Sequence, residues 1–228
     1  MRTQPSRLLI VLAALAVSPA QAGELKGTVK YDGPAPKLEP FKATRDVNVC
    51  GQAVPNESAE VSNGDLANVV VTVAGTSLPK PTPRTITIDQ QGCRYHPHVQ
   101  AAPTGSTLEI LNSDPMLHNI HGRMGTQTLF NLAMPLKGQK IPRRLPTAGL
   151  VDIKCDVHSW MQGYVVVTDE PSAVTGKDGA FEIKDLPAGT YTVTAWQETL
   201  GKKSQQVSVP ATGAASVDFS FGPKSAAR

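Results

Sequence analysis

A cysteine, a histidine and a methionine stand close together in one short stretch of the chain. The stretch is KCDVHSWMQGYVVV, residues 154–167, in which Cys155, His158 and Met161 follow one another at intervals of three. A further histidine, His118, lies upstream in the motif LHNIHG. A thiolate, two imidazoles and a weak axial thioether form the ligand set of a blue-copper electron-transfer centre. The residue types and their spacing therefore predict a copper site made by His118, Cys155, His158 and Met161.

The same four residues admit other interpretations. A structural zinc ion normally binds four strong ligands, and methionine is a weak ligand for zinc. A two-copper centre would need a second cysteine in the loop, which contains only Cys155. A buried structural cysteine with incidental neighbours would not explain why this cysteine stands beside a histidine and a methionine. The prediction of a single copper ion is retained.

Strand-like runs must position these side chains. Short runs rich in valine, threonine and isoleucine recur along the chain, separated by turn-rich pieces such as DGPAP, LPKPTP and GKDG. This pattern is typical of an all-β chain built as β-sandwiches. One weak helical piece is expected between Thr126 and Ala133. The expected strands are residues 25–32, 67–73, 85–89, 106–112, 150–154, 163–168, 180–184, 190–196, 205–209 and 216–221.

Residues 83–169 resemble a cupredoxin and are most similar to amicyanin. The motifs that carry the resemblance are CDVHSWM, residues 155–161, and a proline turn leading into HNIH, residues 118–121. The resemblance implies a Greek-key sandwich with one type 1 copper ion. It further implies that His158 exposes its edge as the electron port and that Met161 tunes the reduction potential. Asn119 would support the site by tying the two ligand loops together.

The segments on either side of this block resemble another kind of sandwich. ELKGTVKYDGPAP and VTGKDGAFEIKDLPAGTYTVTAWQETLG are similar to carboxypeptidase-regulatory-like, transthyretin-type β-sandwiches. We therefore expect residues 23–82 and 170–222 to form one sandwich into which residues 83–169 are inserted, followed by a flexible tail at 223–228. The whole chain also resembles exported proteins described as methylamine-utilisation-like, which combine these two kinds of segment.

The N-terminus is typical of a secretory signal peptide. Arg2 and Arg7 precede the apolar run LLIVLAALAV, and small residues follow at Ala20 and Ala22. The run has about half of the ~20 apolar residues that span a bilayer. We expect cleavage after Ala22, no membrane span in the mature form, and a periplasmic location.

The charge of the chain gives no support for nucleic-acid binding. Lys and Arg number 22 against 19 Asp and Glu. Removing residues 1–22 takes away two arginines and no acid, so the mature chain is nearly neutral. The sequence contains no basic block that would bind a polyanion.

The three cysteines leave one thiol over if two of them pair. An oxidising compartment allows a disulfide. Cys155 stands among metal-ligand residues and the other two do not, so we predict that Cys50 pairs with Cys93. Another pairing, or further free thiols, stays open. The predicted bridge would join the two sandwiches.

The predicted function is to carry single electrons between periplasmic redox partners, such as a c-type cytochrome or a dehydrogenase. The sequence shows no separate acid–base pair or nucleophile–base pair, so we predict that the protein is not an enzyme. A copper-binding or copper-delivery protein is one alternative, and a non-redox structural module is another.

Several further side chains have more than one interpretation. A second metal site could draw on the remaining histidines, although His121 is expected to pack or hydrogen-bond beside the copper site. Methionines near His118, together with Trp160, are expected to fill apolar space or to form a hydrophobic docking patch around His158. Trp196 is expected in a sandwich core. The residues concerned are His96, His98, His121, Met116, Met124, Met134, Trp160 and Trp196.

Overall fold

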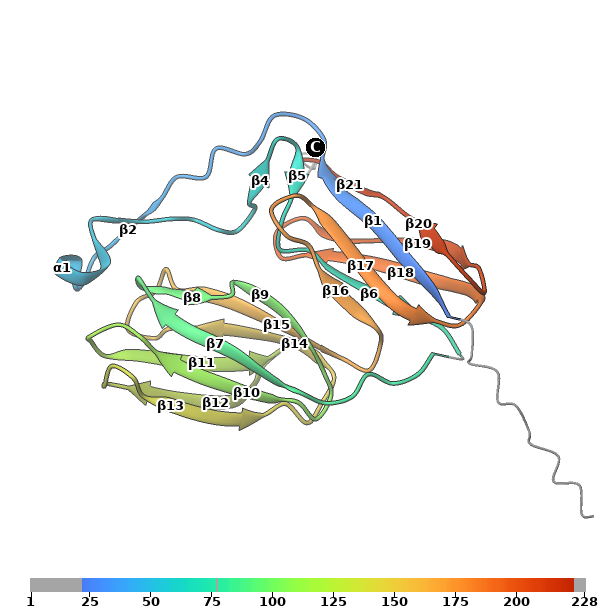
Figure 1. Ribbon diagram of the computed structural model, residues 1–228. Helices are drawn as coiled ribbons and strands as arrows, with labels where there is room; N and C mark the ends of the chain where they lie inside the picture. The colour runs from blue at the N-terminus through green and yellow to red at the C-terminus, as the bar shows by residue number, and fades with distance from the viewer. Residues whose placement is uncertain (1–21, 77, 224–228) are drawn as a thin grey trace, which may run out of the picture.

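The computed structural model describes residues 22–76 and 78–223 (Figure 1). Residues 1–21 of the predicted signal peptide and residues 224–228 of the predicted tail lie outside the described residues. The described chain is all-β, apart from one short helix, α1 (Val47–Cys50). No helix among the described residues combines the length and the apolar character needed to cross a bilayer.

One sandwich is formed by the middle of the chain and appears in green and yellow in Figure 1. Its first sheet has the strand order β13-β10-β7-β8, and its second has the order β12-β11-β14-β15-β9. The strands are β7 (Thr85–Gln91), β8 (Arg94–His96), β9 (Val99–Pro103), β10 (Thr107–Asn112), β11 (His118–Met124), β12 (Gln127–Met134), β13 (Lys140–Arg144), β14 (Gly149–Lys154) and β15 (Gln162–Thr168). We call this unit the site sandwich.

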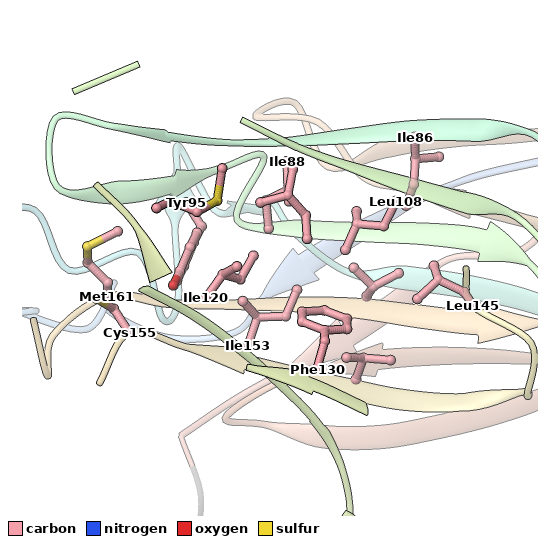
Figure 2. Packing of buried hydrophobic residues seen from close by; sticks show 14 of the residues in the cluster. Ile86, Ile88, Tyr95, Leu108, Ile120, Phe130, Leu145, Ile153, Cys155 and Met161 are labelled. Atoms are coloured by element: carbon pink, nitrogen blue, oxygen red, sulfur yellow. The ribbon is translucent and has the colours of Figure 1, made fainter. Parts of the chain in front are cut away.

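The core of the site sandwich follows from strand alternation. In β10, Leu108 and Ile110 are fully buried while their neighbours face outward, as a period of two requires. In β14, Val151 and Ile153 do the same from the facing sheet. Figure 2 shows such side chains filling the space between the sheets, with Cys155 and Met161 at one end of the cluster. The two sulfur-bearing side chains therefore lie at the edge of a close-packed apolar core.

A second sandwich is built from both ends of the chain. β1 pairs with β17, β20 and β21, which follow the site sandwich in sequence. Its other sheet has the order β16-β6-β18-β19. The strands are β1 (Gly23–Tyr31), β4 (Val61–Ser62), β5 (Asp65–Leu66), β6 (Val70–Ala74), β16 (Ser172–Val174), β17 (Ala180–Leu186), β18 (Gly189–Gln197), β19 (Gly201–Val209), β20 (Ala214–Ser216) and β21 (Phe219–Phe221). We call this unit the outer sandwich.

One segment leaves the outer sandwich and lies against the site sandwich. It comprises β2 (Phe41–Lys42), α1 and β3 (Ala53–Val54), and we call residues 41–54 the cap segment. In Figure 1 it reaches across to the left end of the site sandwich, near β8. Two of its residues, Ala43 and Val54, are buried in the apolar cluster of the site sandwich. Cys50 of α1 is joined by a disulfide to Cys93, the same pair that the sequence analysis favoured.

Three expectations about local structure need correction. Residues 126–133 are not helical, because β12 pairs along its length with β11, from His118 opposite Met134 to Met124 opposite Gln127. The strand expected at 216–221 is interrupted between β20 and β21. Trp196 is not in a sandwich core; it lies half-buried between the sandwiches, its ring 5.6 Å from that of Tyr164.

Candidate metal centre

The predicted ligands come from the same end of three neighbouring strands. His118 is the first residue of β11, Cys155 follows the last residue of β14, and Met161 precedes the first residue of β15. These strands are adjacent in the order β11-β14-β15 and are antiparallel. The start of β11, the end of β14 and the start of β15 therefore meet, and His158 lies in the loop between the last two.

The donor atoms of three of these residues converge. His118 Nδ1 lies 3.1 Å from His158 Nδ1, and Cys155 Sγ lies 3.6 Å from His158 Nδ1. The three donor atoms are all within 4.8 Å of one another. Both imidazoles are 0% exposed, and Met161 is also buried.

A carboxylate faces the far nitrogen of each imidazole. His118 Nε2 lies 2.8 Å from Asp114 Oδ2, and His158 Nε2 lies 3.0 Å from Asp46 Oδ2. A carboxylate only accepts hydrogen bonds, so each Nε2 carries the proton and donates it. Each Nδ1 is then left with a free lone pair directed into the space that the two rings share. This tautomer is the one that a metal-binding histidine needs.

The burial of His118 favours the neutral, ligating form of its ring. Burial lowers the pKa of His118, and the opposing hydrogen bond to Asp114 does not reverse the shift. Burial alone would raise the pKa of Asp114, but hydrogen bonds from the backbone N–H groups of Cys93 and Gly92 and from His118 lower it overall. Asp114 is therefore ionised and His118 neutral around pH 7.

The sulfur of Cys155 is surrounded by hydrogen-bond donors. The backbone N–H groups of Asn119 and His158 lie 3.4 and 3.3 Å from Sγ. These hydrogen bonds fix the position of the sulfur, and a cysteine binds metals through this atom as the thiolate. Asn119 Oδ1 also accepts the backbone N–H of Asp156 at 3.1 Å. This hydrogen bond links the start of β11 to the loop that carries Cys155.

This donor set fits a copper ion. Two imidazole lone pairs 3.1 Å apart repel each other unless a cation lies between them. Metal–imidazole bonds of about 2.0 Å allow two nitrogens at this separation to bind one ion. Two imidazole nitrogens and one cysteine sulfur that converge are ligand types that copper takes in proteins, and Met161 is buried at the end of the same loop.

The expected exposure of His158 is wrong. Its ring is fully buried rather than open at one edge, because the cap segment lies over it and the Asp46 carboxylate accepts a hydrogen bond from its Nε2. Sequence reasoning missed both carboxylates. Asp114 stands four residues before His118 and could have been noticed in the turn NSDP. Asp46 is 112 residues from His158, and its sequence context carries no signal of the contact.

The methionines near His118 fill apolar space, which was one of the two interpretations, and the structure does not favour a docking patch formed with Trp160 around His158. Trp160 is buried and donates its indole N–H to the carbonyl oxygen of Cys93 at 3.2 Å. Met134 is fully buried, while Met116 and Met124 pack against the core cluster. Trp160 and Met134 therefore belong to the interior of the site sandwich and not to a surface patch.

Two of the remaining histidines, His98 and His121, are held by other partners. His121 contacts Asp156 Oδ1 at 3.2 Å and Thr128 Oγ1 at 3.0 Å, so it hydrogen-bonds beside the site. His98 contacts the carbonyl oxygen of Gln162 and the carboxylate of Glu198. Neither residue joins the convergent group of donor atoms around His118.

Comparisons with known proteins give partial structural likenesses. No family model matches the chain, and no curated protein sequence matches it. A reduced amicyanin variant is 29% identical over 37% of this chain and 82% of its own, with a TM-score of 0.34. A purple cupredoxin from Nitrosopumilus maritimus is 26% identical over 36% of this chain and 98% of its own, with a TM-score of 0.32. A copper-containing nitrite reductase from Thermus scotoductus SA-01 is 22% identical over 42% of this chain and 24% of its own, with a TM-score of 0.33. At these TM-scores the likenesses do not establish a family.

Proposed function

We propose that the protein is a type 1 copper protein of the cupredoxin kind that carries single electrons between redox partners. One observation supports this most directly: the Nδ1 atoms of His118 and His158 and the sulfur of Cys155 converge in a buried space. Met161, buried at the end of the same loop, supplies the weak fourth ligand. Bound copper would supply the one-electron step by alternating between its two oxidation states.

The surrounding residues would hold the ligands still during that step. Asp114 and Asp46 fix the orientation of the two imidazoles through their Nε2 atoms. Backbone N–H groups fix the sulfur of Cys155. Buried ligands with satisfied hydrogen bonds have little freedom to rearrange, and the apolar core excludes water. Little reorganisation between oxidation states is what electron transfer requires.

The proposed setting is the periplasm. A disulfide such as Cys50–Cys93 persists in an oxidising compartment, which agrees with export. The proposed partners are a c-type cytochrome or a periplasmic dehydrogenase. Because the cap segment covers the ligand atoms, we propose electron transfer to a protein partner and not catalysis on a substrate bound at the metal.

The test is to add one equivalent of Cu(II) to the purified protein and to record its visible absorption and electron paramagnetic resonance spectra. We expect an intense thiolate-to-copper band and a narrow copper hyperfine splitting. The variant Cys155→Ser is the matched control and should lose the band, because the serine hydroxyl does not replace the thiolate. A pale, tetragonal copper signal in the unaltered protein would refute the proposal.

Reversible redox cycling would separate electron transfer from copper delivery. An electron carrier keeps its metal through many cycles, whereas a delivery protein gives it up to an acceptor. Repeated reduction and reoxidation in the presence of a Cu(I) chelator should leave the blue band unchanged. Rapid loss of the band to the chelator would favour delivery.

A further inference from the structure

The cap segment brings a charged side chain to a ligand of the site sandwich. Asp46 Oδ2 lies 3.0 Å from His158 Nε2, although the two residues are 112 positions apart. The Asp46 side chain is 46% exposed, whereas the His158 side chain is 0% exposed. Asp46 therefore stands at the boundary between solvent and the imidazole.

The side chain of Asp46 contacts His158 and does not cap the N-terminus of α1. Asp46 is the N-cap residue of α1, yet its side chain makes no capping hydrogen bond. Its φ of 50° lies in the left-handed region, which non-glycine residues adopt at a cost. Aspartate usually satisfies a helix N-terminus from this position. Here its carboxylate instead contacts His158.

A disulfide and two buried side chains hold the cap segment in place. The Cys50–Cys93 disulfide ties α1 to the site sandwich. Ala43 and Val54 are buried in its apolar cluster. The anchor at Cys93 is itself part of the site, because its backbone N–H donates to Asp114 Oδ2 and its carbonyl accepts from Trp160. The cap segment is therefore attached to a residue that hydrogen-bonds Asp114, the partner of His118, and it also carries Asp46, the partner of His158.

From these contacts we infer that residues 41–54 form a built-in cap over the edge of His158, with Asp46 as a positioning residue. The cap closes the route by which solvent and small solutes would reach Nε2, and it holds the ring with Nδ1 turned inward. Electrons that enter or leave through His158 must cross the cap. The effect on copper described below rests on the proposed function, whereas the shielding of His158 does not.

A carboxylate on Nε2 also changes the ligand strength of His158. The hydrogen bond to a negative charge raises the electron density of the ring and makes Nδ1 a stronger donor. A stronger donor stabilises the more highly charged Cu(II). Asp46 therefore lowers the reduction potential, and the variant Asp46→Asn should raise it. Loss of such a partner typically weakens metal binding by about 10-fold or more.

The first test needs no metal. Diethyl pyrocarbonate modifies accessible, neutral histidines, and peptide mapping gives a rate for each one. In the full chain, His158 should react far more slowly than the partly exposed His96. The variant Asp46→Gly keeps the left-handed backbone without strain and removes the carboxylate, so His158 should react several-fold faster. Asp46→Asn retains an acceptor and should give a smaller increase.

Controls separate an opened cap from general unfolding. Glu39→Gln removes a negative charge from an exposed residue just before the cap segment and should leave the His158 rate unchanged. His118 is buried elsewhere in the same site, so its slow reaction in Asp46→Gly would show that the fold is intact. Cys50→Ser should also accelerate modification of His158 by releasing the anchor. Equal modification rates of His158 in the unaltered protein and in Asp46→Gly, with His118 protected in both, would overturn the inference that residues 41–54 form a cap.

A second test uses the copper-loaded protein. Asp46→Asn should raise the reduction potential relative to both the unaltered protein and Glu39→Gln. An unchanged potential in a protein with an intact blue band would overturn the role of Asp46 as a positioning residue. Failure of the unaltered protein to form the blue band would instead refute the proposed function, and the modification rates would still decide whether the cap exists.

Discussion

At the residue scale, Asp114 and Asp46 perform the same task but are predictable to different degrees. Asp114 is local to His118, so an acidic residue before a candidate ligand is a usable sequence signal. Asp46 reaches His158 through tertiary structure alone. The residue types of the four predicted ligands are unusual enough to be recognised in sequence. The residues that orient them are common types, and their contacts follow only from the fold.

Met161 gives the first prediction at this scale. Replacing it by leucine should leave copper bound and raise the reduction potential, because a weak axial donor to Cu(II) is removed while the buried volume is kept. Potentiometric titration with visible detection would measure the shift. Met124→Leu makes the same change at the far end of β11 and should leave the potential unaltered. Complete loss of copper from Met161→Leu would show that Met161 is a stronger ligand than proposed.

At the element scale, strands with apolar alternation could be predicted and strands without it could not. β11 reads HNIHGRM, and its inward positions are His118, Ile120 and Gly122, so the apolar pattern is interrupted at the residues that matter for the site. β13 reads KIPRR and lies at the edge of its sheet, where Pro142 is tolerated. Both strands form because their neighbours pair with them. Their own sequences favour the structure only weakly.

A glycine in β1 gives a prediction for the outer sandwich. β20 and β21 pair with β1 on either side of Val217, and a Cβ at Gly27 would lie 1.8 Å from the backbone oxygen of Val217. Backbone atoms cannot move aside as a flexible side chain can. Gly27→Ala should therefore lower the free energy of unfolding by about 2 kcal/mol or more, measured by urea denaturation.

The matched control for Gly27 is another glycine of the same sandwich. A Cβ at Gly222 would meet its nearest atom at 3.6 Å, an ordinary contact. Gly222→Ala should change stability by less than about 0.5 kcal/mol. Equal effects of the two substitutions would contradict the close approach at Gly27.

At the scale of the whole molecule, the two sandwiches meet through a buried ion pair. His98 of the site sandwich contacts Glu198, which follows β18 of the outer sandwich, and their side chains are 8% and 3% exposed. The pair is not visible in the sequence, because the residues are 100 positions apart. The bounds 23–82, 83–169 and 170–222 remain a prediction for the folding units.

This ion pair makes stability depend on pH. Burial alone lowers the pKa of His98, but the hydrogen bond and charge of Glu198, with smaller contributions from Glu57 and the Gln162 carbonyl, raise it overall. A group whose pKa is raised on folding contributes its full stabilisation at pH values below its unfolded pKa, which is about 6.5 for histidine. This contribution is lost as the pH rises through the folded pKa. Glu198→Gln should therefore lower the free energy of unfolding by about 3 kcal/mol at about pH 5.5 and by less at about pH 8.5.

The measurement is the difference in free energy of unfolding between the unaltered protein and Glu198→Gln, from about pH 5.5 to about pH 8.5. Other titrating groups near the pair, Arg94, Glu57 and Tyr164, are present in both proteins and largely cancel in the difference. Glu170→Gln changes a half-buried acid outside this contact and should give a difference that varies little with pH. A difference for Glu198→Gln that grows with rising pH would have the wrong sign and would reject the charged pair.

The disulfide of the cap segment also bears on how the chain matures. A chain exported with its N-terminus first, as the predicted signal peptide implies, would bring Cys50 and Cys93 into the oxidising compartment before Cys155. The first two thiols could then pair before the third arrives, and their oxidation would remove them as competitors for it. Cys155 would enter that compartment with the other two cysteines already joined. The order of the cysteines along the chain would thus protect the proposed ligand thiol of Cys155 from mispairing during export.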